Sequence, residues 1–307
     1  MYAKILNILR ADSSPKKSHD LGRILGISPE DLIKYVNTLE EYGYIFQSTP
    51  GTIKLTRSPD TPFSWEFPER ESRIHYFQEI DSTMTHARKL GEAGAPDFTV
   101  VIAETQEKGR GRLERKWVSS SGGLYFTLVL RPVMLPERSS MINFLASLVL
   151  AKVLNRLYPV DARVKWPNDI LINERKVSGM IAEMVLSGPQ VNYINLGIGI
   201  NVNNHPEYQE PNACSLKTIL GKPVSRCQLL GNFLDEFEKR MKEQLVDHDI
   251  ISEWKQHTIT IGRQVRVVTT KDACTGIATD VDDSGALILE QPDGKIKRVI
   301  YGDCFLN

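Results

Sequence analysis

Two short clusters that combine basic residues with glycine and tryptophan carry the most informative chemistry of this chain. The first is Gly109-Arg110-Gly111-Arg112, followed by Lys116-Trp117. The second is Lys165-Trp166-Pro167-Asn168-Asp169, followed by Lys176 and Gly179. Glycine lets the backbone turn tightly and approach a ligand, and the guanidinium of arginine matches phosphate and carboxylate oxygens. Together the clusters predict a site that binds a polyanion.

Fixed cations of this kind suit the attack of a carboxylate on the α-phosphate of ATP. Two anions must meet while negative charge builds on the phosphoryl oxygens, and positive side chains stabilise that charge most in the transition state. Arg110, Arg112 and Lys176 are the candidates for this role. For Lys165 at a strand end and Lys176 in the tight turn 173–176, a plainer interpretation stays open: both charges could face solvent.

Other kinds of catalytic site are not indicated. The sequence has no GxSxG nucleophile motif, no HExxH zinc motif and no GxxxxGK[ST] phosphate loop, and its six histidines lack ligand spacing. We therefore expect no metal site built by protein ligands alone. Mg²⁺ that accompanies a nucleotide needs only one or two carboxylates, and Asp169 is the candidate ligand.

Composition limits the class of protein. The 307 residues suffice for two or three domains, and 38 basic and 38 acidic residues give a net charge of zero. Binding to nucleic acid would therefore depend on a local patch. The four cysteines lack metal-ligand spacing, which is typical of reduced thiols. With no signal peptide and no stretch of membrane-spanning length, we expect a soluble cytoplasmic protein without a membrane partner.

Residues 1–57 are predicted to form a winged helix-turn-helix. Apolar spacing predicts a helix ending near Ala11, a second over residues 18–25 capped by Ser18 or Asp20, and a third that begins at Ser28-Pro29. A hairpin around Pro50-Gly51 follows. The candidate DNA-binding residues are Lys16, Lys17, Arg23 and Lys34. Acidic residues at the start of the third helix oppose DNA binding, so a helical appendage for packing or dimerisation stays an alternative.

The rest of the chain is predicted to be α+β. Residues 58–72 are proline-rich and are expected to be a linker. Residues 73–257 alternate strands with helices, which indicates a mixed sheet with helices covering one face. The expected strands are 73–77, 99–103, 123–130, 163–166, 170–172, 179–186 and 193–200, and the expected helices are 82–90, 141–157 and 229–245. Residues 258–307 are expected to form an SH3-like barrel with strands at 265–268, 275–279, 286–289 and 296–299.

Several ordered motifs resemble those of the biotin–protein ligases. They are Asp81-Ser82-Thr83, Ala103-Glu104-Thr105-Gln106, GRGRLERKW at 109–117, KWPNDILI at 165–172, RKVSGMIAE at 175–183, NLGIGINVN at 195–203 and GALILEQPDG at 285–294. The N-terminal segment is similar to that of bifunctional members, which also repress biotin genes. The resemblance therefore covers nearly the whole chain.

The resemblance implies a reaction and its partners. Biotin and ATP would form biotinyl-5′-AMP on a class II synthetase-like central domain, and biotin would then pass to a lysine of a biotin carboxyl carrier domain. It also implies Mg²⁺, a biotin operator on DNA and a homodimer when the adenylate is bound. The lipoate–protein ligases, which share the adenylate strategy, are the first alternative. A transcription regulator that only senses a ligand is the second.

The resemblance also assigns roles to residues. The implied catalytic residues are Lys176, Arg112 and Arg110. The implied biotin-binding residues are Ser82, Thr83, Gln106, Gly109, Arg110, Arg112, Trp117, Lys176, Gly179, Gly197 and Gly199, the glycines leaving room for the ligand. The implied ATP-binding residues are Arg112, Lys165, Asn168, Asp169 and Asn201, with Asp169 also at the metal. Met84 departs from the family, which often has asparagine there, and no residue is assigned in the expected adenylate loop 203–214.

Overall fold

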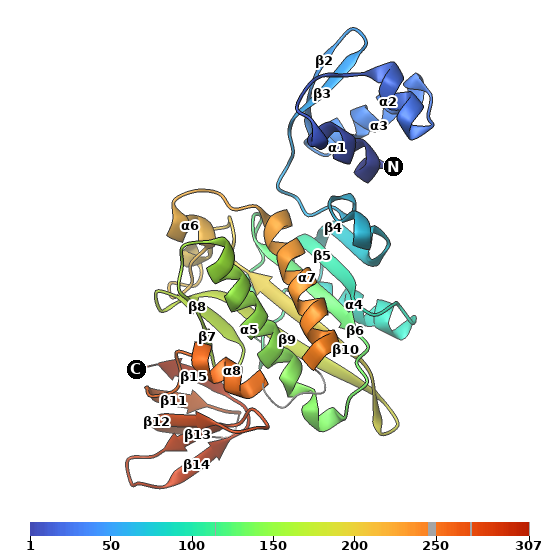
Figure 1. The fold of residues 1–307 in the computed structure, drawn as a ribbon. Helices are drawn as coiled ribbons and strands as arrows, with labels where there is room; N and C mark the ends of the chain where they lie inside the picture. The colour runs from blue at the N-terminus through green and yellow to red at the C-terminus, as the bar shows by residue number, and fades with distance from the viewer. Residues whose placement is uncertain (114, 245–249, 271, 307) are drawn as a thin grey trace. The chain divides into compact units, whose positions relative to one another are not determined.

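The computed structural model describes residues 1–113, 115–244, 250–270 and 272–306. The chain forms two compact units, Met1–Ser72 and Arg73–Asn307 (Figure 1). The predicted helix over 229–245 ends at a residue outside this description.

The first unit contains three helices and a hairpin, as predicted. They are α1 (Tyr2–Ala11), α2 (Ser18–Leu25), α3 (Pro29–Glu41), β2 (Ile45–Thr49) and β3 (Thr52–Arg57). Ser28 caps α3, since its Oγ accepts a hydrogen bond from the backbone N–H of Asp31 at 3.1 Å. The predicted cap of α2 is wrong. The two residues of β1 (Lys16–Lys17) pair with β3, so Lys17 takes the N-cap position and no side chain caps the helix.

Residues 58–72, expected to be a linker, pack against the rest of the first unit. They contain the short 3-10 helix η1 (Ser64–Glu66) and most of η2 (Pro68–Arg73). Arg10 donates to both carboxylate oxygens of Glu66, at 2.9 and 2.8 Å. Trp65 donates from Nε1 to the Tyr44 hydroxyl at 2.9 Å. These contacts make the segment part of the N-terminal core.

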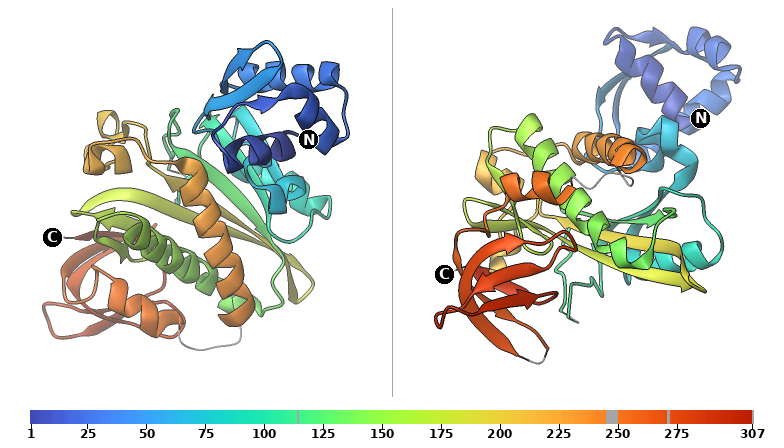
Figure 2. Two further views of the ribbon diagram at one scale, coloured as in Figure 1. Left: turned by 45° about the horizontal axis from the view of Figure 1, so that its top comes forward. Right: turned by 60° about the horizontal axis from the view of Figure 1, so that its bottom comes forward.

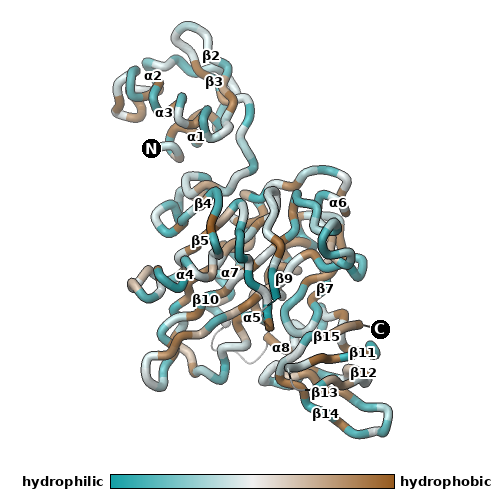
Figure 3. The backbone as a smooth tube through the Cα atoms, turned by 180° about the vertical axis from the view of Figure 1, so that it is seen from behind, coloured by the Kyte–Doolittle hydropathy of each residue, from teal (hydrophilic) through white to brown (hydrophobic). Residues whose placement is uncertain are grey.

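A seven-stranded mixed sheet forms the centre of the second unit. Its strand order is β4-β5-β6-β10-β9-β8-β7, and only the β4–β5 pair is parallel. The strands are β4 (Ile74–Ile80), β5 (Thr99–Gln106), β6 (Leu124–Leu130), β7 (Ala162–Lys165), β8 (Asp169–Ile172), β9 (Arg175–Ser187) and β10 (Gln190–Ile200). All seven predicted strands are confirmed. Hydrophobic stretches run along several strands of this sheet (Figure 3).

Helices lie on both faces of this sheet, so the prediction that they cover one face is wrong. Phe126 of β6 contacts Phe233 of α7 (Arg226–Gln244), with ring centroids 5.7 Å apart. Val129 of the same strand packs instead with Ala87 of α4 (Thr83–Glu92). Residues an odd number apart in a strand point to opposite faces. The short α4 covers only part of its face, whereas α5 (Ser140–Leu157) joins α7 on the other (Figure 2).

One stretch, Pro136–Leu157, is long and apolar enough by length and composition to cross a membrane. The prediction that no stretch reaches that length is therefore wrong. Of its most apolar window, 67% is buried inside the protein. The helix α5 in this stretch packs against α7, α8 (Ile250–His257) and strands of the sheet. A helix surrounded in this way needs apolar side chains on nearly every side.

The C-terminal strands form a five-stranded antiparallel sheet of order β14-β13-β12-β11-β15. They are β11 (Gln264–Val268), β12 (Ala273–Val281), β13 (Leu287–Glu290), β14 (Ile296–Val299) and β15 (Asp303–Leu306). The four predicted strands are confirmed, and β15, α6 (Leu216–Leu220) and α8 were not predicted. The buried Trp166 ties this sheet to the central one: its Nε1 donates to Gly285 O at 2.9 Å.

Candidate functional site

A cavity of about 520 Å³ lies in the second unit and is lined by most of the predicted site residues. Of the residues predicted for catalysis, biotin and ATP, Ser82 and Gly109 do not line it. The predicted residues in its wall are Thr83, Gln106, Arg110, Arg112, Trp117, Lys165, Asn168, Asp169, Lys176, Gly179, Gly197, Gly199 and Asn201. The cavity therefore joins segments that lie far apart in sequence, from Thr83 at the start of α4 to Leu306 at the end of β15.

A polar cluster forms where α4 begins. The backbone N–H and Oγ1 of Thr83 donate to Gln106 Oε1 at 2.8 and 3.0 Å. The Nε2 of Gln106 donates to Ser119 Oγ at 2.8 Å. The neighbouring Ser82 hydroxyl is buried and has no hydrogen-bond partner among the described residues. A ligand with a compact polar head finds both donors and acceptors here.

Two lysines and one carboxylate form a charged cluster. Lys176 Nζ lies 2.7 Å from Asp169 Oδ1, and Lys165 Nζ lies 3.9 Å from Asp169 Oδ2. Lys165 is 16% exposed in its side chain, so the interpretation that it faces solvent is wrong. The hairpin that brings the cluster together turns at Asn173 and Glu174, both with positive φ, as a two-residue type I′ turn requires.

The two arginines of the glycine-rich loop point to different partners. Arg112 Nη1 donates to Asn168 Oδ1 at 3.0 Å inside the cavity wall. Burial lowers the pKa of Arg112, and nearby Asp303 and Asp169 oppose this, so the guanidinium stays charged. Arg110 Nη2 instead lies 2.5 Å from Glu183 Oε1 on β9. Arg112 is thus the arginine that faces the charged cluster.

The predicted pocket glycines make room for the chain's own side chains in this structure. A Cβ added to Gly199 would lie 2.4 Å from Trp117 Cε2, and one on Gly179 would lie 2.9 Å from Trp117 Cζ3. A Cβ on Gly197 would meet Met84 Sδ at 2.6 Å. The Trp117 ring therefore packs against Gly179 and Gly199, and Lys176 Nζ lies 5.3 Å from its centroid. Gly109 lies behind the wall, against Trp117 O and Ser119 Oγ.

Two parts of the wall contain no residue that the sequence analysis assigned to the site. One is the loop 203–214, where Lys176 N–H donates to Asn212 O at 2.8 Å. The other comes from the C-terminal sheet: Arg115 pairs with Asp303 at 2.5 Å, and Arg263 pairs with Glu174 at 2.8 Å. The lining residues in these two parts are Pro206, Glu210, Asn212, Ala213, Arg263, Asp303, Cys304, Phe305 and Leu306, and Met84, the noted departure from the family, lines the cavity as well. For the first part, the sequence signals were the polar composition of 203–214 and the adenylate loop expected there.

The described residues contain no group of three or more His, Cys, Asp or Glu side chains that could hold a metal ion. Asp169 lines the cavity beside Lys165 and Lys176. A single carboxylate fits a cation that is bound mainly by nucleotide phosphates.

Three of the four candidate DNA-binding residues of the first unit lie in surface ion pairs. Lys16 pairs with Asp12, Arg23 lies 3.9 Å from Asp20, and Lys34 lies 3.0 Å from Asp31. Lys17 is exposed on β1. Such pairs are weak in water, so a phosphate can replace the acidic partner.

Comparisons with known proteins match both parts of the second unit. A model described as "Biotin/lipoate A/B protein ligase family" matches residues 76–201, and one described as "Biotin protein ligase C terminal domain" matches residues 260–307. The bifunctional ligase/repressor BirA of Bacillus subtilis (strain 168) is 30% identical over 300 residues, which cover 92% of this chain and 91% of that protein.

Two further relatives match this chain over most of their own length. The biotin–[acetyl-CoA-carboxylase] ligase of Paracoccus denitrificans is 35% identical over 225 residues, 70% of this chain and 93% of that protein. The solved biotin protein ligase of Aquifex aeolicus in complex with biotin and ATP has a TM-score of 0.65 at 29% identity, covering 76% of this chain and 98% of that one.

Proposed function

Because this chain belongs to the biotin–protein ligase family, we propose that it converts biotin and ATP to biotinyl-5′-AMP and then biotinylates a lysine of a biotin carboxyl carrier domain. The ligase activity itself follows from the family. The observation that carries this particular reaction is one cavity with a polar cluster at Thr83 and Gln106 and a charged cluster at Lys176, Asp169 and Arg112.

The polar cluster fits the ureido head of biotin. That head offers two N–H donors and one carbonyl acceptor, and burial requires a partner for each. Gln106 Oε1 accepts, and the buried Ser82 hydroxyl has unused capacity. In this assignment Trp117 closes over the apolar body of biotin from its position above Gly179 and Gly199.

The charged cluster fits adenylate formation. A biotin carboxylate oxygen attacks the α-phosphorus, the bond to the β-phosphate oxygen breaks, and pyrophosphate leaves with the electron pair. Lys176 exchanges Asp169 for the incoming oxygens and stabilises their growing charge, while Arg112 covers the site from the loop. In the second step a neutral acceptor lysine attacks the biotinyl carbonyl and loses a proton, and AMP leaves.

Asn168, Asn201 and Lys165 are assigned to the nucleotide, and Asp169 to a Mg²⁺ ion shared with its phosphates. Such an ion supplies further neutralisation of phosphate charge when bound. Asn168 is buried and fixed between Arg112 and the Met180 carbonyl, so it is a rigid part of the wall.

Mass spectrometry of a carrier domain incubated with protein, biotin and ATP tests this function. We expect a gain of one biotinyl group on one lysine, lost when ATP is omitted and absent when lipoate replaces biotin. Labelling by lipoate would support the lipoate-ligase alternative, which the match at residues 260–307 disfavours. Biotin binding without any ATP cleavage would support a ligand sensor.

For the first unit we propose a winged helix-turn-helix that binds the operator of biotin genes, and for the C-terminal sheet an SH3-like barrel. The support for DNA binding is the order of helices and hairpin and the BirA names of relatives that align over most of this chain. A mobility-shift assay with biotin and ATP tests it. Failure of the shift when Lys16, Lys17, Arg23 and Lys34 are replaced would identify the contact surface.

Dimerisation of the adenylate-bound form and a cytoplasmic location are further proposals. Sedimentation with and without biotin and ATP tests the first. The second is supported by buried thiols at Cys214, Cys274 and Cys304, which suit a reducing compartment. Fractionation of cells tests it.

A further inference from the structure

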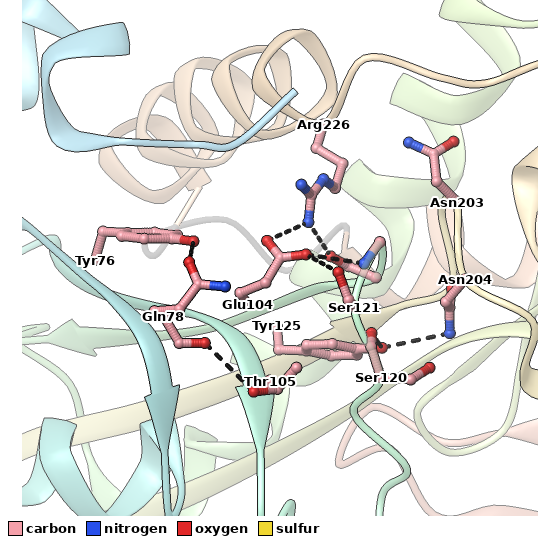
Figure 4. A network of polar contacts seen from close by, with 12 residues as sticks. Tyr76, Gln78, Glu104, Thr105, Ser120, Ser121, Tyr125, Asn203, Asn204 and Arg226 are labelled. Carbon is pink, nitrogen blue, oxygen red and sulfur yellow. Dashed lines mark hydrogen bonds and ion pairs between the residues drawn. The ribbon is translucent and has the colours of Figure 1, made fainter. Parts of the chain in front are cut away.

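A chain of hydrogen bonds connects the backbone at Ser120 to the side chain of Asn201 in the cavity wall. The Tyr125 hydroxyl donates to Ser120 O at 2.8 Å. The Nδ2 of Asn204 donates both to the Tyr125 hydroxyl at 3.3 Å and to Asn201 Oδ1 at 3.0 Å. Figure 4 shows the Tyr125 hydroxyl beside Ser120 and joined to Asn204 by a dashed line.

The donor and acceptor chemistry of these groups fixes the direction of each hydrogen bond. A carbonyl only accepts hydrogen bonds, so Ser120 O takes the single hydroxyl proton of Tyr125. The tyrosine oxygen is then left to accept, which matches the Nδ2 of Asn204. Asn201 Oδ1 accepts the other proton of that Nδ2, so the end of Asn201 left for a ligand is its own Nδ2. Tyr125, Asn201 and Asn204 are all buried, where such chains reinforce one another.

A buried ion pair fixes the backbone next to both ends of this hydrogen-bond chain. Arg226 Nη1 lies 2.8 Å from Glu104 Oε2, and both side chains are 7% exposed. Glu104 Oε1 accepts from Ser121 Oγ at 2.5 Å and from the N–H of Gly122 at 3.0 Å, next to Ser120. Gly122 O accepts in turn from the N–H of Asn203 at 2.7 Å, next to Asn204.

We propose that Tyr125 and Asn204 are positioning residues of the nucleotide site, which orient Asn201 so that its Nδ2 donates to an acceptor atom of ATP. This rests on the proposed function, which assigns Asn201 to the nucleotide. The biotin end of the cavity lies on a separate set of bonds, from Thr83 to Gln106 and Ser119. A change in the hydrogen-bond chain from Ser120 to Asn201 should therefore weaken the binding of ATP and leave the binding of biotin unchanged.

Two variants interrupt the chain at different points. Asn204→Asp replaces the donating amide by a carboxylate, which only accepts. The Asn201 amide then has to rotate so that its Nδ2 donates to this carboxylate and is no longer available to a ligand. Tyr125→Phe removes the hydroxyl that fixes Asn204. Tyr193→Phe is the matched control, because it removes another buried hydroxyl, bonded to Arg88 O at 3.4 Å, outside the chain.

The measurement is the KM for ATP and the KM for biotin in adenylate formation, followed by pyrophosphate release. We expect the KM for ATP to rise about tenfold in Asn204→Asp and about fivefold in Tyr125→Phe, with less than about twofold change for biotin or in the control. Combined with Asn201→Ala, Tyr125→Phe should add nothing further, because both act through Asn201.

The outcomes separate this inference from the function it rests on. If the carrier domain is never labelled by the unaltered protein, the proposed function fails. If Asn201→Ala leaves the KM for ATP unchanged, the assignment of Asn201 fails, and the inference with it. If Asn201→Ala raises that KM but Tyr125→Phe does not, the positioning role alone is wrong. Equal effects on biotin and ATP, or additive effects in the double variant, also overturn it. Tyr125→Phe keeps the test open if Asn204→Asp does not fold.

Discussion

Lys176 and Asp169, on the adjacent strands β9 and β8, form an ion pair of 2.7 Å in the wall of the cavity. The pair keeps a cation in place without leaving its charge uncompensated. In the proposed reaction, a carboxylate or phosphate that enters takes the place of Asp169 and is stabilised by the charge of Lys176.

Lys176→Ala is expected to slow adenylate formation about 10²–10³-fold, because its charge acts mainly on the transition state. The Kd of biotin should change less than about fivefold, since Thr83 and Gln106 bind the other end. Single-turnover pyrophosphate release and calorimetry measure the two effects. Lys222→Ala, at an exposed lysine outside the cavity wall, is the control. Equal loss in both measurements would refute the catalytic role.

Arg112→Gly is expected to release the adenylate into solvent, because it removes the bond to Asn168 and part of the cavity wall. The released intermediate would label lysines of a bystander protein. Arg110→Gly is the comparison, since that guanidinium lies on Glu183 instead. Biotin blots of the bystander protein should show clearly more label with Arg112→Gly. The reverse order would mean that Arg110 closes the site.

The strands and the charged residues were predictable because their signals are local. The Asn173-Glu174 turn and the apolar runs beside it define a hairpin, and that hairpin alone brings Lys176 to Asp169. The contributions of Arg263 and Asp303 were not predictable. They depend on how the C-terminal sheet docks against the central one through Trp166, and no local pattern reports that contact.

The side chain that packs against the pocket glycines could be identified only from the three-dimensional structure. The sequence predicts only that Gly179 and Gly199 leave space, not what fills it. The structure shows the ring of Trp117, which comes from a loop more than 60 residues earlier in the chain, because 179 minus 117 is 62.

Gly199→Ala tests this contact. Its Cβ would lie 2.4 Å from Trp117, so the ring must move into the cavity or the strand must shift. We expect the Kd of biotin to rise at least about tenfold, with a loss of about 1–3 kcal/mol in stability from overpacking. Calorimetry and thermal melting measure these. Gly111→Ala, whose Cβ meets nothing closer than 3.3 Å, should have a milder effect, and equal effects would argue against this contact.

Glu104→Gln is expected to destabilise the protein at neutral pH by about 3 kcal/mol, because it leaves Arg226 charged and buried. Burial alone would raise the pKa of Glu104, but Arg226, Ser121 and the Gly122 N–H outweigh it and lower that pKa. The stabilisation is therefore present above the unfolded value of about 4.3 and lost as the pH falls through the folded value.

Chemical unfolding from pH 7 to 3 measures this contribution. The gap between the unaltered protein and Glu104→Gln should be widest at neutral pH and should narrow below about pH 4.3. Glu69→Gln, at an exposed position of η2, is the control. A gap that stays constant with pH would show that the carboxylate charge has no part in the pair.

The last prediction concerns where the N-terminal unit ends. Residues 58–72 contribute Glu66 to Arg10, and Phe63 and Trp65 to an aromatic cluster with Tyr42. A fragment of residues 1–57 lacks these partners and exposes the surface they cover, so it should melt at lower temperature than a fragment of residues 1–72. Circular dichroism measures both. The variant Trp65→Ala in the longer fragment should lower the midpoint part of the way, because it removes the ring contacts and the bond to Tyr44 but keeps the pair of Glu66 with Arg10. Equal midpoints for the two fragments would mean that residues 58–72 add nothing to the stability of this unit, and the boundary would then lie at residue 57 as the proline-rich sequence predicts.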